Sequence, residues 1–237
     1  GDIEALRTKI DKDTSFIIME PVQGEGGIHP APAGFLQDVR KLCDENGILL
    51  IFDEIQAGLG RTRKMWACDH WNTAPDIMCL AKGIAGGVPM SATLVRPDIL
   101  AAMSKGEHSS TFGGNPLSCA AGIATIKALT QDGLVDNAAR VGKIFRDGLE
   151  KLRDKHSIIR EIRGMGLMIG IEMKFEVKDI LMDGISEGVL LLYSGRNIIR
   201  LLPPLVLSEQ DITKVLEVLD RLMVREAERR KNVQGQD

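Results

Sequence analysis

Residues 48–87, ILLIFDEIQAGLGRTRKMWACDHWNTAPDIMCLAKGIAGG, decide the fold of this chain. An aliphatic run, 48–52, ends in an acid, Asp53, and a second apolar run, 77–81, ends in a base, Lys82. Both runs are bounded by turn-forming residues and have the length of fully buried parallel strands. Ligands of open α/β sheets lie off the carboxyl ends of such strands. We therefore expect a carboxylate and an amine at one edge of a sheet, where they can hold a cofactor that needs both.

The rest of the chain alternates between predicted strands and helices up to residue 133. The strands are expected at 16–19, which is predicted to be buried, and at 91–95, and the helices at 2–12, 32–47, 64–72, 97–103 and 116–130. This alternation predicts an α/β fold with a largely parallel sheet. From residue 134 the pattern changes to long polar-faced helices and short strands. The helices are expected at 134–155, 176–187 and 208–230, and the strands at 158–163, 167–173, 189–193 and 198–202. We therefore predict a large domain at 1–133 and a smaller α+β domain at 134–237.

Composition excludes several classes of protein. A chain of 237 residues can bury a sizeable core, and its net charge of −3 gives no reason to expect a nucleic acid or an anionic membrane as partner. No apolar run has the length of a transmembrane helix, and the start, GDIEALRTKID, lacks the basic and apolar regions of a signal peptide. The four cysteines and four histidines show no metal-binding spacing. We expect a cytoplasmic protein with reduced thiols and no metal site.

Six motifs occur in a fixed order along almost the whole chain. They are EPVQGEGG at 20–27, IFDEIQAGLGRT at 51–62, PDIMCLAKGIAGG at 75–87, STFGGNPL at 110–117, RGMGLMIGIE at 163–172 and IRLLPPL at 199–205. With these motifs the chain resembles the class III, fold-type I, pyridoxal-phosphate aminotransferases. The resemblance implies the PLP-transferase type I fold, pyridoxal 5'-phosphate as cofactor and a homodimer. Because the chain enters the family pattern partway along, we expect it to be the C-terminal portion of a longer chain. The preceding part normally supplies a phosphate loop and the aromatic residue that stacks on the cofactor ring.

The resemblance gives roles to four residues of the central stretch. Lys82 resembles the lysine that binds the cofactor covalently and then moves a proton, and we expect it to be buried behind Leu80 and Ala81. Asp53 resembles the acid that keeps the ring nitrogen protonated, so that the ring accepts electrons. Ile55 and Gln56 resemble residues that pack on the ring and hydrogen-bond its phenolic oxygen. The residues alone leave open a surface lysine at a strand end and an aspartate that caps a turn.

Thr111 precedes the sequence FGGNP. Its hydroxyl and the amides after it suit a phosphate, because glycines let the backbone approach an anion closely. The resemblance implies that Thr111 reaches the phosphate bound by the neighbouring subunit. An ordinary Gly-Asn-Pro turn ahead of a helix explains the same residues.

Arg200 lies between aliphatic residues in NIIRLLPPL. A guanidinium in such a setting needs a partner, and a planar carboxylate binds it in a bidentate manner. Arg200 resembles the arginine that binds the substrate α-carboxylate, and Glu25 the glutamate that pairs with it until a dicarboxylate displaces it. Glu20 is expected to contribute to the same substrate site. A structural salt bridge for Arg200 and a solvated loop acid for Glu25 are the alternatives.

The expected reaction transfers an ω-amino group from N-acetylornithine, or from a similar acylated ornithine or lysine, to 2-oxoglutarate in arginine or lysine biosynthesis. An amino-group carrier protein is a further expected partner. Three alternatives stay open. The first is another enzyme of the same fold, namely a 4-aminobutyrate or ornithine aminotransferase, a glutamate semialdehyde aminomutase or a decarboxylase. The second is an inactive structural fragment. The third is a Rossmann-type nucleotide-binding module suggested by the glycines of RGMGLMIG, although its fingerprint lacks the third glycine at the right place.

Overall fold

A computed structural model describes residues 1–234 and divides into two compact units. The first unit consists of Gly1–Val22 and Pro30–Val135, and the second of Gln23–His29 and the chain from Asp136 onward. This division differs from the continuous domain predicted for 1–133, because segment 23–29 packs with the second unit. The boundary at 133/134 therefore stays a prediction about independently folding domains. Among residues 1–234, no helix combines the length and the apolarity needed to span a membrane.

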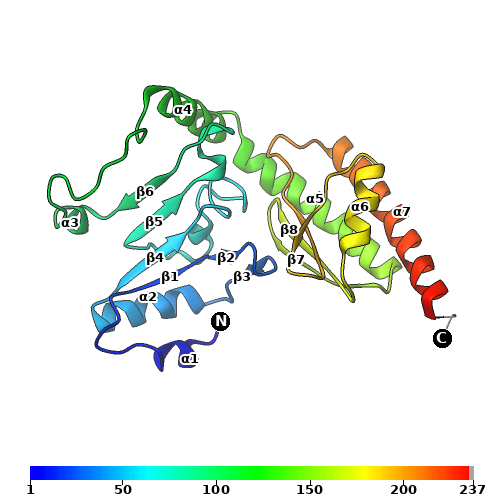
Figure 1. Cartoon of the computed structure of the whole chain (residues 1–237), viewed down its shortest axis with the longest axis horizontal. Helices are drawn as coiled ribbons and strands as arrows, with labels where there is room; N and C mark the ends of the chain where they lie inside the picture. The colour runs from blue at the N-terminus through cyan, green and yellow to red at the C-terminus, as the bar shows by residue number, and fades with distance from the viewer. Residues whose placement is uncertain (235–237) are drawn as a thin grey trace. The chain divides into compact units, whose positions relative to one another are not determined.

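The first unit is built on a four-stranded sheet (Figure 1). Its strands lie in the order β1 (Phe16–Met19), β4 (Leu49–Asp53), β5 (Ile77–Leu80) and β6 (Ala92–Val95). The pairs β1–β4 and β4–β5 are parallel, and β6 is antiparallel to β5. The prediction of a mostly parallel sheet is confirmed. Because β4 and β5 run in the same direction, their carboxyl ends share one edge of the sheet.

The predicted burial of strand 16–19 is wrong. Phe16 and Ile18 each expose more than half of their surface. The strand lies at the edge of the sheet and pairs only with β4 among the described residues. A strand with one neighbour and no cover on its outer face keeps that face accessible.

Helices of the first unit follow the hydrophobic pattern of the sequence. They are α1 (Ile3–Arg7), α2 (Phe35–Asn46), α3 (Pro97–Leu100), α4 (Pro116–Gln131) and the 3₁₀ helices η1 (Ala67–Trp71) and η2 (Lys82–Ala85). Helix α2 buries Leu36, Val39, Leu42 and Cys43 and ends at Gly47, which has a left-handed φ of 64°. The predicted glycine cap is confirmed. The helix begins at Phe35, three residues after the proline that was expected to open it.

Asp76 connects the sheet to α2 in the first unit. Its buried carboxylate accepts the Leu50 amide at 2.7 Å and the Arg40 guanidinium at 2.8 Å. Arg96, just after β6, donates to the other oxygen. A buried acid is tolerated when it is hydrogen-bonded in this way. Asp76 therefore fixes the approach of the chain to β5, the strand that leads to Lys82.

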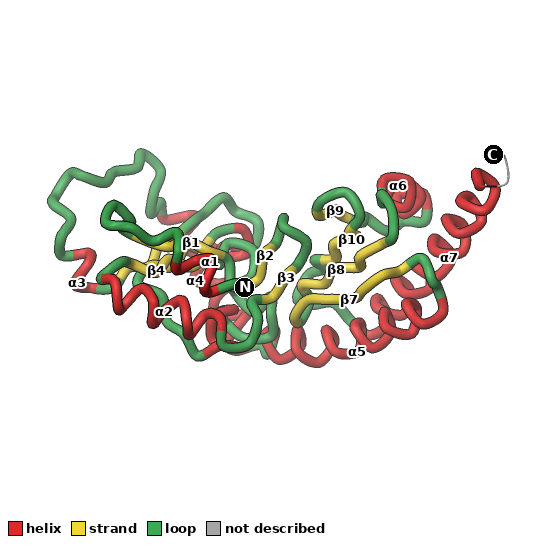
Figure 2. The backbone as a smooth tube through the Cα atoms, turned by 90° about the horizontal axis from the view of Figure 1, so that it is seen from below, coloured by secondary structure: helices red, strands yellow, loops and turns green. Residues whose placement is uncertain are grey.

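The second unit consists of a four-stranded antiparallel sheet and the helices that pack on it (Figure 2). Its strands lie in the order β7 (Ile159–Met165), β8 (Met168–Met173), β10 (Ile198–Leu201) and β9 (Leu192–Ser194). The helices are α5 (Leu134–Lys155), α6 (Lys178–Ser186) and α7 (Glu209–Gln234). Figure 2 shows α5 running along the sheet, and apolar side chains from helices and strands form one core. Two-residue strands β2 (Val22–Gln23) and β3 (His29–Pro30) pair with each other at the two ends of segment 23–29.

The glycines of RGMGLMIG form a tight hairpin between β7 and β8. The two strands pair antiparallel, and Gly166 between them has a left-handed φ of 56°. A dinucleotide fingerprint joins a strand to a helix, so this hairpin argues against the Rossmann-type alternative. The close turn also lets α5 approach, because a Cβ atom at Gly142 would lie 2.5 Å from the carbonyl oxygen of Gly166.

Candidate functional site

Asp53 is the last residue of β4 and is half-buried. Its Oδ1 accepts a hydrogen bond from the backbone N–H of Ile55 at 2.9 Å. This contact is the one expected of an aspartate that caps a turn, the alternative role given to Asp53 above. In the parallel register Asp53 lies opposite Cys79 on β5. Burial, together with the nearby Asp53 carboxylate, raises the pKa of the Cys79 thiol. Asp53 therefore lies at the sheet edge where β5 leads into Lys82.

Glu54 is a residue of this site that sequence reasoning missed. It is fully buried, and its two carboxylate oxygens accept the amides of Ala67 and Cys68, each at 2.7 Å. Burial raises the pKa of Glu54, while these two amides act in the opposite direction. The signal in the sequence was the second acid of the DE pair directly after a buried strand, because such an acid needs internal donors.

The loop that Glu54 closes carries Ile55 and Gln56. Both are half-buried and directly follow Glu54. The turn is tight, because the Gly58 amide donates to the Glu54 carbonyl at 3.0 Å and a Cβ at Gly58 would lie 2.9 Å from that oxygen. The two residues proposed to touch the cofactor ring therefore sit on a loop whose far end is bound by a buried carboxylate.

Lys82 occupies an unusual backbone conformation. Ala81 is extended, and Lys82 then turns into the left-handed region with a φ of 48° and begins η2. A non-glycine residue in this region costs about 1–3 kcal/mol and persists where its surroundings enforce it. The chain continues from Lys82 as η2, where Ile84 and Ala85 are buried and α4 packs against the helix.

The predicted burial of Lys82 is wrong. Leu80 is buried and Ala81 is half-buried, but Lys82 itself is exposed. The backbone enters the left-handed region at Lys82, two residues after β5 ends at Leu80.

Thr111 is exposed in a glycine-rich turn before α4. Ser110 accepts the Gly113 amide at 3.0 Å, and Asn115 caps α4 by accepting the Ser118 amide at 3.0 Å. The turn lines a pocket of about 530 Å³. Its walls are Pro89, Met90, Ser91, Ser110, Phe112, Gly113, Gly114, Asn115, Ser118 and Cys119. A glycine turn at the start of a 16-residue helix suits a phosphate, and it equally fits the ordinary turn considered in the sequence.

The second unit brings Glu25 and Arg200 together. Arg200 lies on β10 between Gly170 of β8 and Leu192 of β9, and its side chain is only 11% exposed. Its guanidinium forms an ion pair with Glu25, whose side chain is 72% exposed. Arg200 thus has the carboxylate partner that its apolar setting required. Glu20, a half-buried residue directly after β1, belongs to the first unit.

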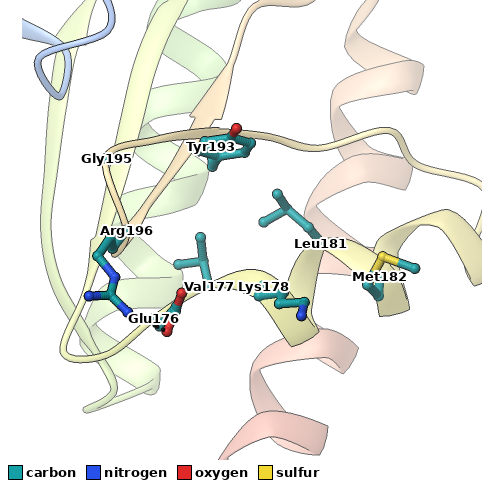
Figure 3. Close-up of a pocket in the computed structure, with 8 residues that line it drawn as sticks. All are labelled: Glu176, Val177, Lys178, Leu181, Met182, Tyr193, Gly195 and Arg196. Atoms are coloured by element: carbon teal, nitrogen blue, oxygen red, sulfur yellow. Dashed lines mark hydrogen bonds and ion pairs between the residues drawn. The ribbon is translucent and has the colours of Figure 1, made fainter.

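A separate pocket of about 390 Å³ lies in the second unit (Figure 3). It is lined by Glu176, Val177, Lys178, Leu181, Met182, Tyr193, Gly195 and Arg196. Figure 3 shows Leu181 and Tyr193 facing this space, and Arg196 pairs with Glu176 at 3.4 Å. The pocket contains none of the predicted site residues, so its shape adds nothing to their assignment.

Comparison with known proteins identifies the family. Residues 1–223 match the family model described as aminotransferase class-III, and the chain belongs to this family. It is 45% identical to acetylornithine aminotransferase from Caldanaerobacter subterraneus subsp. tengcongensis, and the match covers 94% of this chain and 57% of the relative. It is 44% identical to LysW-aminoadipate semialdehyde transaminase from Deinococcus radiodurans, covering 94% of this chain and 52% of that protein.

A solved structure of ornithine aminotransferase from Toxoplasma gondii ME49 superimposes with a TM-score of 0.92 at 35% identity. The match covers 96% of this chain and 56% of that one. The expected fold, the PLP-transferase type I fold, is therefore confirmed. The chain spans slightly more than half the length of the relatives it matches.

Proposed function

We propose that this chain is the catalytic-lysine portion of a pyridoxal-phosphate-dependent aminotransferase that acts on the ω-amino group of N-acetylornithine or a similar acylated ornithine or lysine. The amino acceptor in this proposal is 2-oxoglutarate, and the products are the semialdehyde and glutamate. The observation that carries the proposal is the parallel pairing of β4 with β5. Because of this pairing, Asp53 at the end of β4 and the segment that leads from β5 to Lys82 lie at the same edge of the sheet. The names of the relatives support this class of donor.

The residues of the first unit fit the cofactor. When bound, pyridoxal phosphate supplies an electron-withdrawing ring that stabilises negative charge on the substrate carbon. Asp53 would keep a proton on the ring nitrogen, Ile55 would pack on the ring and Gln56 would bond its phenolic oxygen. The exposed amine of Lys82 would hold the cofactor and then carry a proton from the substrate carbon. Thr111 would bind the phosphate of the neighbouring subunit.

Residues of the second unit would bind the substrate carboxylate. Arg200 would hold it as a bidentate pair, and Glu25 would leave the guanidinium when a dicarboxylate arrives. Glu20 would make a further contact with the substrate. One site could then accept both an ω-amine donor and 2-oxoglutarate.

The assembly proposed is a cytoplasmic homodimer, with an amino-group carrier protein as a further candidate partner. Apolar side chains in and after the Thr111 turn support the dimer. Phe112 is 81%, Leu117 74% and Ile123 57% exposed. Large apolar side chains gathered along one segment are typical of association surfaces.

The experiment that tests the cofactor role is reductive trapping. The 237-residue chain is incubated with pyridoxal phosphate, reduced with borohydride and digested for mass spectrometry. A label confined to the Lys82 peptide, and lost in Lys82→Ala, supports the proposal. An unlabelled chain, or equal labelling of the other lysines, overturns it.

The donor class is tested by the visible spectrum of the bound cofactor. Bleaching by N-acetylornithine supports an acylated donor. Bleaching by ornithine or 4-aminobutyrate, with no response to N-acetylornithine, moves the protein to one of the alternative class III activities.

A further inference from the structure

Segment 23–29 is anchored at its start by Ser194. This serine is fully buried at the end of β9, and its hydroxyl lies 3.0 Å from the Gly24 carbonyl oxygen and 2.7 Å from that of Glu25. A serine hydroxyl has one proton, so it donates a shared hydrogen bond to the two carbonyls. The peptide on each side of the Glu25 α-carbon is therefore in contact with one buried donor.

Arg163 anchors the end of the same segment. It is buried on β7, and its Nε donates to the Gly27 carbonyl at 2.7 Å. Its Nη1 donates to Glu161 and Glu172, which neutralise the buried charge. The Arg163 guanidinium, with help from Arg160, lowers the pKa of Glu172 against the effect of burial. Glu172 therefore stays ionised at neutral pH as the partner of Arg163.

Ile28 adds an apolar contact to these polar anchors. It is fully buried and packs where Gly164 and Gly170 leave space, since a Cβ at either glycine would come within 3.0–3.1 Å of its side chain. Three independent contacts thus fix the backbone of the segment on the sheet of the second unit.

The Glu25 side chain extends from this anchored backbone to the Arg200 guanidinium. It is largely exposed, while its partner Arg200 is nearly buried. The pair is exposed on the Glu25 side, and holding a long exposed side chain in one geometry costs side-chain entropy. Fixing the backbone of one partner in advance reduces that cost, as preorganisation does in any binding site.

We propose that Ser194 and Arg163 are positioning residues that hold Glu25 over Arg200 and thereby set the affinity of Arg200 for carboxylates from solution. This rests on the proposed function, in which Arg200 binds the substrate carboxylate. A loosened segment pairs less often with Arg200, so an external carboxylate competes more easily. Loss of the Ser194 hydrogen bond should tighten carboxylate binding by about 3- to 10-fold, the factor that one net hydrogen bond represents.

A double-mutant cycle on the 237-residue chain tests this inference. Isothermal titration with glutarate measures Kd for the unmodified chain, Ser194→Ala, Glu25→Gln and the double variant. Tighter binding in Ser194→Ala that disappears in the Glu25→Gln background supports the positioning role, because a general structural effect would persist there. Ser157→Ala, an exposed serine of the same unit, is the matched control and should leave Kd unchanged.

The outcomes separate the two proposals. If Glu25→Gln does not tighten glutarate binding, the role of Arg200 in the proposed function fails. If Glu25→Gln tightens binding but Ser194→Ala has no effect, or the same effect in both backgrounds, the positioning role is overturned. Ser194→Cys keeps a side chain of similar size with a weak donor and should give an intermediate Kd if Ser194→Ala does not fold.

Discussion

Replacing Glu54 with glutamine keeps the shape of the side chain but removes one of its two acceptor oxygens. In the native chain each oxygen accepts one backbone amide at 2.7 Å, from Ala67 and Cys68. Glutamine can satisfy one amide, and its own NH₂ group then faces the other. A buried N–H left without an acceptor costs about 1–3 kcal/mol. Removal of a buried charge offsets part of this cost, so we expect the free energy of unfolding to fall by about 1–2 kcal/mol.

Thermal unfolding followed by circular dichroism measures the effect at pH 7. For a chain of this size, a loss of about 1.5 kcal/mol lowers the midpoint by about 3–6 °C. Glu4→Gln, with a side chain that is 78% exposed, is the matched control. A Glu54→Gln midpoint equal to that of the control would refute the role assigned to the two amide bonds.

The same variant has a defined pH dependence. Burial raises the pKa of Glu54 above its ordinary value of about 4.5, so ionisation costs the folded state more than the unfolded state. The contribution of Glu54 to the free energy of unfolding is therefore fully present below about pH 4.5, and it shrinks as the pH rises through the pKa of Glu54 in the folded state. The difference in free energy of unfolding between the native chain and Glu54→Gln should be larger at pH 4 than at pH 7, measured by urea titration. A difference that grows with pH would contradict the assigned direction.

Three further predictions follow from buried contacts. Burial acts to raise the pKa of Asp76, but its amide and guanidinium donors lower this pKa overall. The contribution of Asp76 to the free energy of unfolding is therefore present above about pH 3.8 and is lost as the pH falls through the pKa of the folded state. Asp76→Asn should therefore cost about 2–3 kcal/mol in urea unfolding at pH 7 and less at pH 3, whereas a constant difference would contradict this. Gly142→Ala should lower the thermal midpoint, because its new methyl group would meet the Gly166 carbonyl and overpacking costs about 1–3 kcal/mol; an unchanged midpoint would show that α5 can shift freely. Dithionitrobenzoate should label half-buried Cys119 before Cys68, whose thiol pKa is raised by burial; the reverse order would disprove the assigned burial.

Local chemistry made much of the first unit predictable. The apolar runs before Asp53 and Lys82 became the neighbouring parallel strands β4 and β5, and Gly47 ended its helix in the left-handed region. These features depend on residues close together in the chain. Hydrophobic periodicity and glycine conformation therefore describe them without knowledge of the distant sequence.

Exposure and long-range docking were less accessible to prediction. The apolar character of its neighbours predicts burial of Lys82, but the backbone turns into the left-handed region at this residue and Lys82 is exposed. Segment 23–29 was placed with the strands that flank it in sequence. Its carbonyls instead bond to Arg163 and Ser194, more than a hundred residues further along. No local pattern in EPVQGEGG indicates which distant side chains will bind its backbone.

In both units a buried polar residue fixes the backbone next to an acid with a proposed role. Glu54 is fully buried and binds the amides that close the loop after Asp53. Ser194 is fully buried and binds the backbone on both sides of Glu25. These neighbouring acids have the proposed roles: Asp53, which is half-buried, and Glu25, which is exposed. Anchoring the backbone through a neighbouring buried group restricts where the functional side chain can reach, and this explains why substitution of Ser194 should change carboxylate binding as well as stability.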